Sequence, residues 1–205
     1  MVNVYKTTII ICEGPSEENY IKELNKYFRE SSIHIILTPK VVGTGEYKSV
    51  IKKYREVYQE YNGRNKKNKM PIEIWVDFDI YHRDNNNCMT NYKNKPKLIP
   101  DFLFSYENFE DFLVLHEDKV QLQKWEEICN KHNHFDIPLH ENKYLPLLRD
   151  NIFPGYEKGS LPINIDKNSL NNLFEHNNND ENIKIKSDFA SFLSSIDELV
   201  NSLKD

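Results

Sequence analysis

Short apolar runs alternate with longer amphipathic segments through the first 80 residues, and this alternation constrains the fold more than any other sequence feature. The first run, from Thr7 to Cys12, ends at a Glu-Gly-Pro-Ser turn. An apolar run closed by a tight turn is typical of a buried central strand. Ser16 is expected to cap the next segment, a helix, because apolar residues recur there at spacings of three and four.

The same pattern continues along the chain. In order, the sequence predicts a strand at 33–37, a glycine loop at 41–45, an amphipathic helix over 50–61 and a third strand at 72–79. Strands that alternate with helices indicate an α/β fold with a mostly parallel, Rossmann-like sheet flanked by helices. The tyrosines of the second helix, Tyr54, Tyr58 and Tyr61, are interpreted as packing residues and not as a base-stacking platform.

The remainder of the chain is first polar and then helical. Residues 82–97 are rich in Asn and predict a mobile loop, which residues 98–105 follow as a fourth strand. Helices are expected from Phe109 onward and then at 119–131, 141–149, 167–175 and 187–203, with a surface linker at 176–186. We therefore divide the chain into an α/β core, residues 1–118, and a helical C-terminal region packed on it, residues 119–205.

Composition excludes several classes of protein. No apolar stretch approaches the roughly 20 residues of a membrane helix, and no signal peptide opens the chain, so no membrane association is expected. Cys12, Cys88 and Cys129 lie far apart without a C-x-x-C motif, which predicts a reducing cytoplasm and no disulfide framework. The net charge of −5 disfavours wrapping of nucleic acid by the whole molecule, but not a local basic patch or a metal ion among carboxylates.

Three carboxylates follow predicted strands. Glu13 comes directly after the first strand, and Asp77 and Asp79 end the third. Ligands of open α/β sheets bind beyond the carboxyl ends of the strands, so these side chains are expected to converge. Residues i and i+2 of a strand share a face, which would place Asp77 beside Asp79. Like charges this close favour a cation, and oxygen ligands suit Mg²⁺ or Mn²⁺, so the pattern predicts a metal-dependent phosphoryl-transfer site.

Four segments, taken in order, carry a family resemblance: residues 10–20, 74–79, 104–116 and 155–159. A Glu-Gly pair after an apolar strand, followed by Asp-x-Asp at a later strand end, resembles the TOPRIM domain of topoisomerases, primases and OLD-family nucleases. More narrowly, the four segments resemble the RloB-like family, TOPRIM-related proteins of bacterial restriction and abortive-infection loci. The resemblance covers about the first 160 residues and implies a TOPRIM-like fold and catalytic core.

The resemblance also implies roles for particular residues. Glu13 would be a general acid/base or a metal ligand, Asp77 and Asp79 would be metal ligands, and Glu110 would supply a further carboxylate. Two metal ions about 4 Å apart could activate water and stabilise the leaving oxygen of a phosphodiester. The candidates for holding the phosphate are Lys48, Lys158 and the backbone of Gly43 and Gly45.

This chain departs from the family pattern at the acidic pair. The family shows Asp-Arg-Asp slightly later after the Trp, whereas this sequence has Asp77-Phe78-Asp79. An alternative match places Asp79 at the first aspartate and Tyr81 at the second, with Asp84 as a substitute.

The resemblance implies a Mg²⁺-dependent nuclease, a hydrolase of DNA or RNA phosphodiesters, in anti-phage defence. It also implies a partner, an ATPase of the AAA or ABC-like kind. The alternative is a non-catalytic subunit of the same fold that binds or regulates such an ATPase. The helical C-terminal third is a candidate surface for that ATPase or for a homo-oligomer.

One further pattern concerns metal. Cys129-x-x-His132-x-His134, with His140 nearby, contains zinc-ligand residue types. Its spacing fits no standard finger, and it follows a helix whose end already needs a cap, so zinc is disfavoured here. His116 is interpreted as a satisfied core or boundary histidine and not as a catalytic one.

Overall fold

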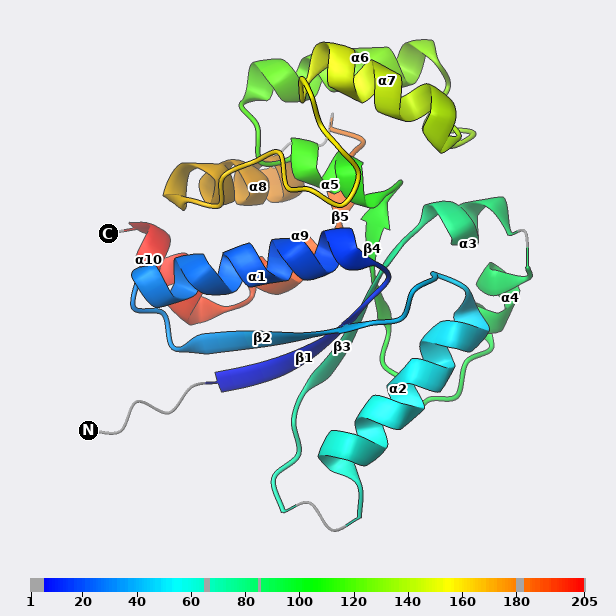
Figure 1. Cartoon of the computed structure of the whole chain (residues 1–205), viewed down its shortest axis with the longest axis vertical. Helices are drawn as coiled ribbons and strands as arrows, with labels where there is room; N and C mark the ends of the chain where they lie inside the picture. The colour runs from blue at the N-terminus through cyan, green and yellow to red at the C-terminus, as the bar shows by residue number, and fades with distance from the viewer. Residues whose placement is uncertain (1–5, 65–66, 85, 180–182, 205) are drawn as a thin grey trace. The chain divides into compact units, whose positions relative to one another are not determined.

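The computed structural model describes residues 6–64, 67–84, 86–179 and 183–204 (Figure 1). The chain divides into two compact units, Met1–Phe104 and Ser105–Asp205. Within the described residues the sheet has the strand order β2-β1-β3-β4-β5, with β1 Lys6–Cys12, β2 Ile35–Val41, β3 Ile72–Asp77, β4 Phe102–Tyr106 and β5 Lys186–Ser187. The predicted α/β class with a mostly parallel sheet is confirmed. Its TOPRIM-like subtype and the functional division at residues 118/119 stay predictions.

The first unit is built around β1, which lies between two parallel neighbours. It pairs with β2 over all seven of its residues and with β3 from Ile9 to Cys12. Ile9, Ile10 and Ile11 are fully buried. A parallel strand covered on both faces needs such a continuous apolar run, which is why the first strand could be recognised in the sequence.

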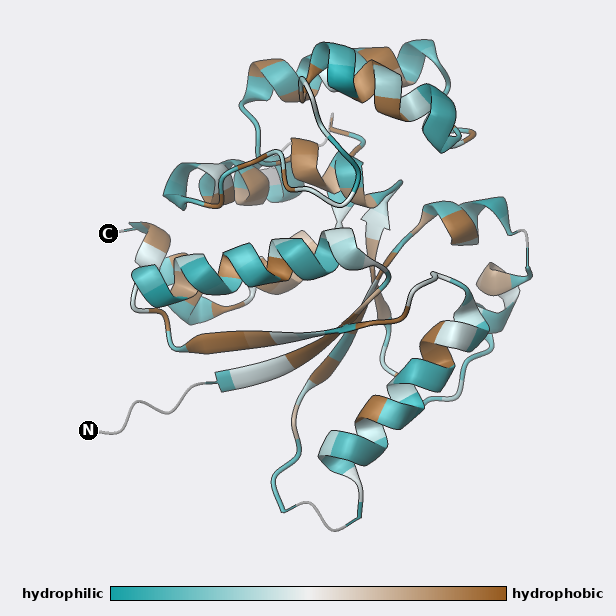
Figure 2. Cartoon of the chain, viewed as in Figure 1, coloured by the Kyte–Doolittle hydropathy of each residue, from teal (hydrophilic) through white to brown (hydrophobic). Residues whose placement is uncertain are grey.

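Helices α1 (Pro15–Glu30) and α2 (Tyr47–Asn62) lie on opposite sides of these strands (Figure 1). Helix α1 packs against β2, whereas α2 contacts β1 and β3. The crossovers from β1 to β2 and from β2 to β3 run in opposite directions across the sheet, so two right-handed crossovers place their helices on opposite faces. Figure 2 shows largely apolar strands between helices that alternate polar and apolar residues.

Two boundaries in this unit differ from the prediction. The N-cap of α1 is Gly14 and not Ser16, because Pro15 begins the helix with a φ that already suits it. Strand β2 continues through Thr38 and Pro39, which the sequence analysis took as its end. A proline lacks the ladder N–H but is tolerated on an edge strand, and β2 is an edge of the sheet.

The end of β3 is a further correction. Phe78 has helical backbone angles (φ −79°, ψ −15°), and Asp79 begins the short helix α3 (Asp79–Arg83). The strand therefore stops at Asp77, and Asp77 and Asp79 are not alternate residues of one strand.

The prediction of a loop over residues 82–97 is also wrong, because helix α4 (Cys88–Lys93) forms within this segment. Tyr92 packs its ring on Phe102 and Phe104, with centroid distances of 4.9 and 5.3 Å, and Tyr81 joins them. These contacts connect residues far apart in sequence, so the Asn-rich composition does not reveal them. Strand β4 begins at Phe102, four residues later than predicted.

In the second unit the end of β4 pairs antiparallel with β5, with Ser105 opposite Ser187. Its helices are α5 Phe109–Val114, α6 Lys119–Lys131, α7 Glu141–Asn151, α8 Lys167–Asn179, α9 Asp188–Ser194 and α10 Asp197–Lys204. Helix α8 extends into the predicted linker at 176–186, of which residues 180–182 lie outside the described residues.

The single helix predicted at 187–203 is two helices. Ser194 and Ser195 each donate a side-chain hydrogen bond to a carbonyl three residues back. Serine hydroxyls that bond locally in this way compete with helix continuation. The chain therefore leaves α9 at Ser195 and begins α10 at Asp197.

Among the described residues, none of the helices combines the length and the apolar character that crossing a bilayer requires. Cys12, Cys88 and Cys129 are buried thiols.

Candidate metal centre

Glu13 lies immediately beyond the carboxyl end of β1, and its neighbours fix its position. The backbone N–H of Asp77 donates to Glu13 Oε2 at 3.3 Å. The glycine loop is held to the same point, because the N–H of Gly43 donates to the Glu13 carbonyl oxygen at 2.8 Å. The predicted convergence of Glu13 and Asp77 is therefore seen in the structure.

Glu17 belongs to this site although the sequence analysis did not select it. It lies in the first turn of α1, four residues after Glu13, and is 4% exposed. Its Oε2 accepts a hydrogen bond from the N–H of Gly14 at 3.0 Å, as the third helical residue of a capping box does. The signal was a glutamate three residues after the true N-cap, and the choice of Ser16 as the cap concealed it.

Glu13, Glu17 and Asp77 form one group, which we call the acidic cluster. Each contributes a carboxylate oxygen, and these three oxygens lie within 4.8 Å of one another. Asp77 ends β3, the strand next to β1. The acidic cluster thus forms where the carboxyl ends of adjacent parallel strands meet, which is the usual place for ligands in open α/β sheets.

The electrostatics of the acidic cluster favour a cation. Burial and the charge of Glu17 raise the pKa of Glu13 from 4.5 to about 8, and Asp79 adds to the effect. Backbone hydrogen bonds from Asp77 and Gly45 oppose this shift of the Glu13 pKa. Ligand carboxyls must be deprotonated, and a bound cation removes the repulsion that keeps the proton on Glu13. An all-oxygen donor set fits Mg²⁺ or Mn²⁺.

Asp79 lies beside the acidic cluster and is not one of its three members. Its Oδ2 is 3.8 Å from Arg83 Nη2, one turn further along α3. The alternative match to the family motif gains no support from Asp84, which accepts a hydrogen bond from the N–H of Met89 at 3.2 Å near the start of α4. Asp79 influences the site through its charge on Glu13.

The backbone of the glycine loop passes close to the Glu13 carboxylate. A Cβ at Gly45 would lie 2.5 Å from Glu13 Oε2, so only glycine lets the loop pass this carboxylate undisturbed. Gly43 has a φ of +94°, a left-handed conformation that other residues rarely adopt. Lys48 is exposed in the first turn of α2. The phosphate-binding roles of Gly43, Gly45 and Lys48 stay predictions.

Glu110 belongs to the second unit, where it lies in the first turn of α5 and is 5% exposed. The hydroxyl of Tyr156 donates to its Oε1 at 3.1 Å, whereas that of Tyr144 donates to Asn108 Oδ1 at 2.9 Å and lies 3.5 Å from Glu110 Oε2. Burial raises the pKa of Glu110, and the charge of Lys158 opposes this shift. Lys158 is ion-paired with Glu141 at 2.8 Å. The catalytic role of Glu110 and the phosphate-binding role of Lys158 stay predictions.

A second group of metal-ligand residue types, Asp111, Cys129 and His134, lies in the second unit and is buried. The N–H of Leu139 donates to His134 Nδ1 at 2.9 Å, and His134 Nε2 lies 2.9 Å from Asp111 Oδ2. A backbone N–H can only donate, so Nδ1 carries no proton and Nε2–H donates to the carboxylate. Burial raises the pKa of the Cys129 thiol, which disfavours the thiolate. These contacts describe a satisfied core histidine and not a zinc site.

Fold and site together define an α/β protein with a carboxylate site at the carboxyl ends of parallel strands. Residues 8–203 of the chain match the family model described as RloB-like protein. The chain therefore belongs to the RloB-like family, as the resemblance in the sequence predicted. No match was found among the curated proteins or among the solved structures.

Proposed function

We propose that this protein is a Mg²⁺- or Mn²⁺-dependent nuclease that hydrolyses phosphodiester bonds of DNA or RNA. The observation that carries the proposal is the acidic cluster, in which carboxylate oxygens of Glu13, Glu17 and Asp77 lie within 4.8 Å of one another. Burial and, after it, the charge of Glu17 raise the pKa of Glu13, and a divalent cation would favour the ionised carboxylates of this group. Membership of the RloB-like family supports the same proposal.

The residues of the acidic cluster and the glycines beside it have separate roles in this proposal. Glu13, Glu17 and Asp77 would hold the ion, which when bound polarises a phosphate oxygen and lowers the pKa of water. Gly14 donates a hydrogen bond to one oxygen of Glu17 and so holds this carboxylate in place. Gly45 keeps the loop clear of Glu13. A preorganised carboxylate set of this kind avoids reorganisation during the reaction.

The biological setting is part of the proposal. The resemblance to proteins of restriction and abortive-infection loci supports a role in anti-phage defence, together with an ATPase of the AAA or ABC-like kind. The acidic cluster lies wholly within the first unit, so all of the proposed metal ligands come from this chain.

The test is a cleavage assay on the full chain with plasmid, single-stranded DNA and tRNA, in the presence of Mg²⁺ or Mn²⁺. We expect Asp77→Asn to lower the cleavage rate at least 100-fold, because it removes a ligand charge. Glu23→Gln is the matched control, since Glu23 is an exposed carboxylate on α1. Cleavage that survives in Asp77→Asn, or that is absent from the wild-type protein, would contradict the proposal.

One observation favours the alternative, a non-catalytic subunit that regulates an ATPase. Asp79, a carboxylate of the family motif, is turned out of β3 and lies 3.8 Å from Arg83. Calorimetric titration with Mn²⁺ separates the two functions. Binding that is lost in Glu13→Gln favours the nuclease, whereas no binding by the wild-type chain favours the subunit.

A further inference from the structure

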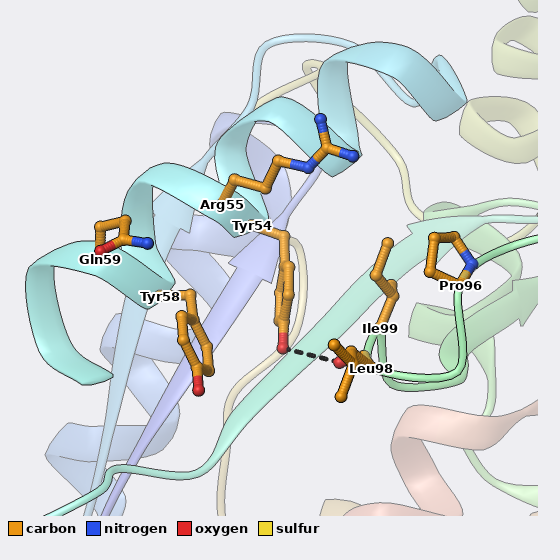
Figure 3. Close-up of a pocket in the computed structure, with 7 residues that line it drawn as sticks. All are labelled: Tyr54, Arg55, Tyr58, Gln59, Pro96, Leu98 and Ile99. Atoms are coloured by element: carbon orange, nitrogen blue, oxygen red, sulfur yellow. Dashed lines mark hydrogen bonds between the residues drawn. The ribbon is translucent and has the colours of Figure 1, made fainter. Parts of the chain in front are cut away.

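A pocket of about 300 Å³ opens between α2 and the loop that precedes β4 (Figure 3). Its walls are two tyrosines of α2 on one side and the Pro96–Ile99 segment on the other. The hydroxyl of Tyr54 donates to the carbonyl oxygen of Leu98 at 3.2 Å, which joins the two walls. Both walls belong to the first unit, as does the acidic cluster.

The pocket presents aromatic surface to solvent. Tyr54 points from α2 toward the opposite wall and Tyr58 lies beside it (Figure 3), with ring centroids 5.9 Å apart and planes inclined by 37°. Tyr58 is 39% exposed and Leu98 90% exposed. The buried face of α2 is formed by other residues, Val50, Ile51 and Val57. Tyr58 therefore packs on Tyr54 as predicted, but it also leaves part of its ring exposed to solvent.

A line of positive charge runs along α2 beside the pocket. Lys48, Lys52 and Arg55 follow one another at spacings of four and three residues, so they share one face of the helix. All three are exposed, and in the described part of the chain none of them forms an ion pair. We call them the α2 basic stripe. Arg55 lines the pocket and extends toward the N-terminal turns of α2 (Figure 3).

The α2 basic stripe leads from the pocket toward the acidic cluster. Helix α2 begins at Tyr47, two residues after Gly45, whose backbone lies against Glu13. The seven residue-to-residue steps of helix from Lys48 to Arg55 span roughly 10 Å at a rise of 1.5 Å per residue. This length suits more than one phosphate of a strand, because successive phosphates of one strand advance about 3.4 Å along the axis of stacked DNA.

We propose that the pocket holds an unpaired base of single-stranded nucleic acid by stacking on Tyr58, while the α2 basic stripe follows the backbone toward the acidic cluster. The part of this proposal that directs the strand toward the acidic cluster rests on the proposed nuclease function. The proposal deepens that function by naming single-stranded nucleic acid as the substrate class. Bases in a duplex are paired and stacked on one another, so their faces are covered, whereas bases of single strands can stack on aromatic side chains. Aromatic surface beside a basic groove is the arrangement that binds single strands without sequence preference.

The test is fluorescence anisotropy of the full chain with labelled single-stranded and duplex oligonucleotides of about 12 nucleotides in EDTA, which removes metal and prevents cleavage. We expect single strands to bind at least about tenfold more tightly than duplexes, and Tyr58→Ala to weaken this binding about tenfold. Tyr58→Phe keeps the ring and should stay within about twofold of wild type. Arg55→Ala should reduce the salt dependence by about 0.7 in slope, whereas the exposed control Arg29→Ala should not.

Three results would overturn the inference. They are equal binding of duplex and single strand, unchanged binding in Tyr58→Ala, or displacement by a nucleoside monophosphate as effective as by the oligonucleotide. Because binding is measured without metal, its outcome is separate from the cleavage assay. If Tyr58→Ala loses binding and the wild-type chain does not cleave nucleic acid, the single-strand pocket is supported and the proposed nuclease is rejected. If the wild-type chain cleaves nucleic acid but Tyr58→Ala binds it as tightly as wild type, the nuclease is supported and the single-strand pocket is rejected.

Discussion

The acidic cluster and the Asp111–Cys129–His134 group each place three metal-ligand residue types within 4.8 Å of one another, yet their polar atoms are satisfied in different ways. In the acidic cluster carboxylates face one another, and burial together with Glu17 raises the pKa of Glu13 to about 8. In the second group, Asp111 accepts hydrogen bonds from Trp125 Nε1–H at 2.6 Å and from His134 at 2.9 Å. The first group has an excess of negative charge, whereas the second has matched donors and acceptors.

This difference shows that proximity of ligand residues does not by itself define a metal site. A buried carboxylate that receives hydrogen bonds on both oxygens contributes to the stability of the core. Carboxylates that repel one another at the carboxyl ends of strands are stabilised only by a cation or a proton. The comparison therefore predicts opposite effects of substitution in the two groups.

The largest effect on stability is expected in the second group. Asp111→Ala should lower the free energy of unfolding by about 3–5 kcal/mol, because it leaves the buried Trp125 N–H and His134 without their acceptor. Urea denaturation measures this change. The exposed Asp136→Ala should stay within about 0.5 kcal/mol of wild type. A loss below about 1 kcal/mol in Asp111→Ala would show that the hydrogen-bonded group is not a structural element.

The next effect concerns metal. Mn²⁺ at about 100 times its dissociation constant should raise the free energy of unfolding by about 2.7 kcal/mol, through binding to the folded state alone. Thermal unfolding with and without Mn²⁺ measures the gain. We expect it to disappear in Asp77→Asn and to persist in Cys129→Ser. The reverse pattern would place the metal in the second group.

A smaller effect concerns pH. The raised pKa of Glu13 means that the folded state binds the proton more tightly than the unfolded state, so this group's contribution is present below about pH 4.5 and is lost as pH rises through about 8. Without metal, Glu13→Gln should flatten this decline and raise the free energy of unfolding above pH 8 by about 1–2 kcal/mol. Urea denaturation across this range tests the expectation. Glu23→Gln should keep the wild-type slope, and an unchanged slope in Glu13→Gln would contradict the account.

The smallest expected effects are those of alanine substitutions at Gly45 and Gly43, which should differ in their effect on Mn²⁺ affinity. Gly45→Ala brings a Cβ to 2.5 Å from the end of the Glu13 side chain, which can shift. We therefore expect a stability loss of under about 1 kcal/mol with Mn²⁺ affinity about three- to tenfold weaker. Gly43→Ala has space but a φ of +94°, so it should cost about 1 kcal/mol and leave Mn²⁺ affinity unchanged. Calorimetry on both variants tests the distinction, and equal Mn²⁺ affinities would remove Gly45 from the site.

Much of the first unit could be predicted from the sequence because its signals are local. The apolar run of β1 and the carboxylates that follow β1 and β3 led to Glu13 and Asp77. The rule that alternate strand residues share a face failed for Asp79, because the chain turns helical at Phe78. Glu17 was missed because its role depends on which residue caps α1.

Other features depend on contacts between distant residues. Helix α4 forms in a polar segment because Tyr92 packs on Phe102 and Phe104, which no local pattern records. The pocket beside α2 likewise needs Leu98, a residue that lies 40 positions after Tyr58 in the sequence. The amphipathic pattern of α2 identified a helix but could not show which tyrosines remain at the surface.

The most direct test of the account is the location of a bound metal ion. A crystal of the full chain soaked in Mn²⁺ should give an anomalous difference peak about 2.1–2.2 Å from carboxylate oxygens of Glu13 and Asp77, a distance typical of small divalent ions. A peak at Asp111, Cys129 and His134 instead, or none at the acidic cluster, would contradict the claim that this cluster is the metal centre.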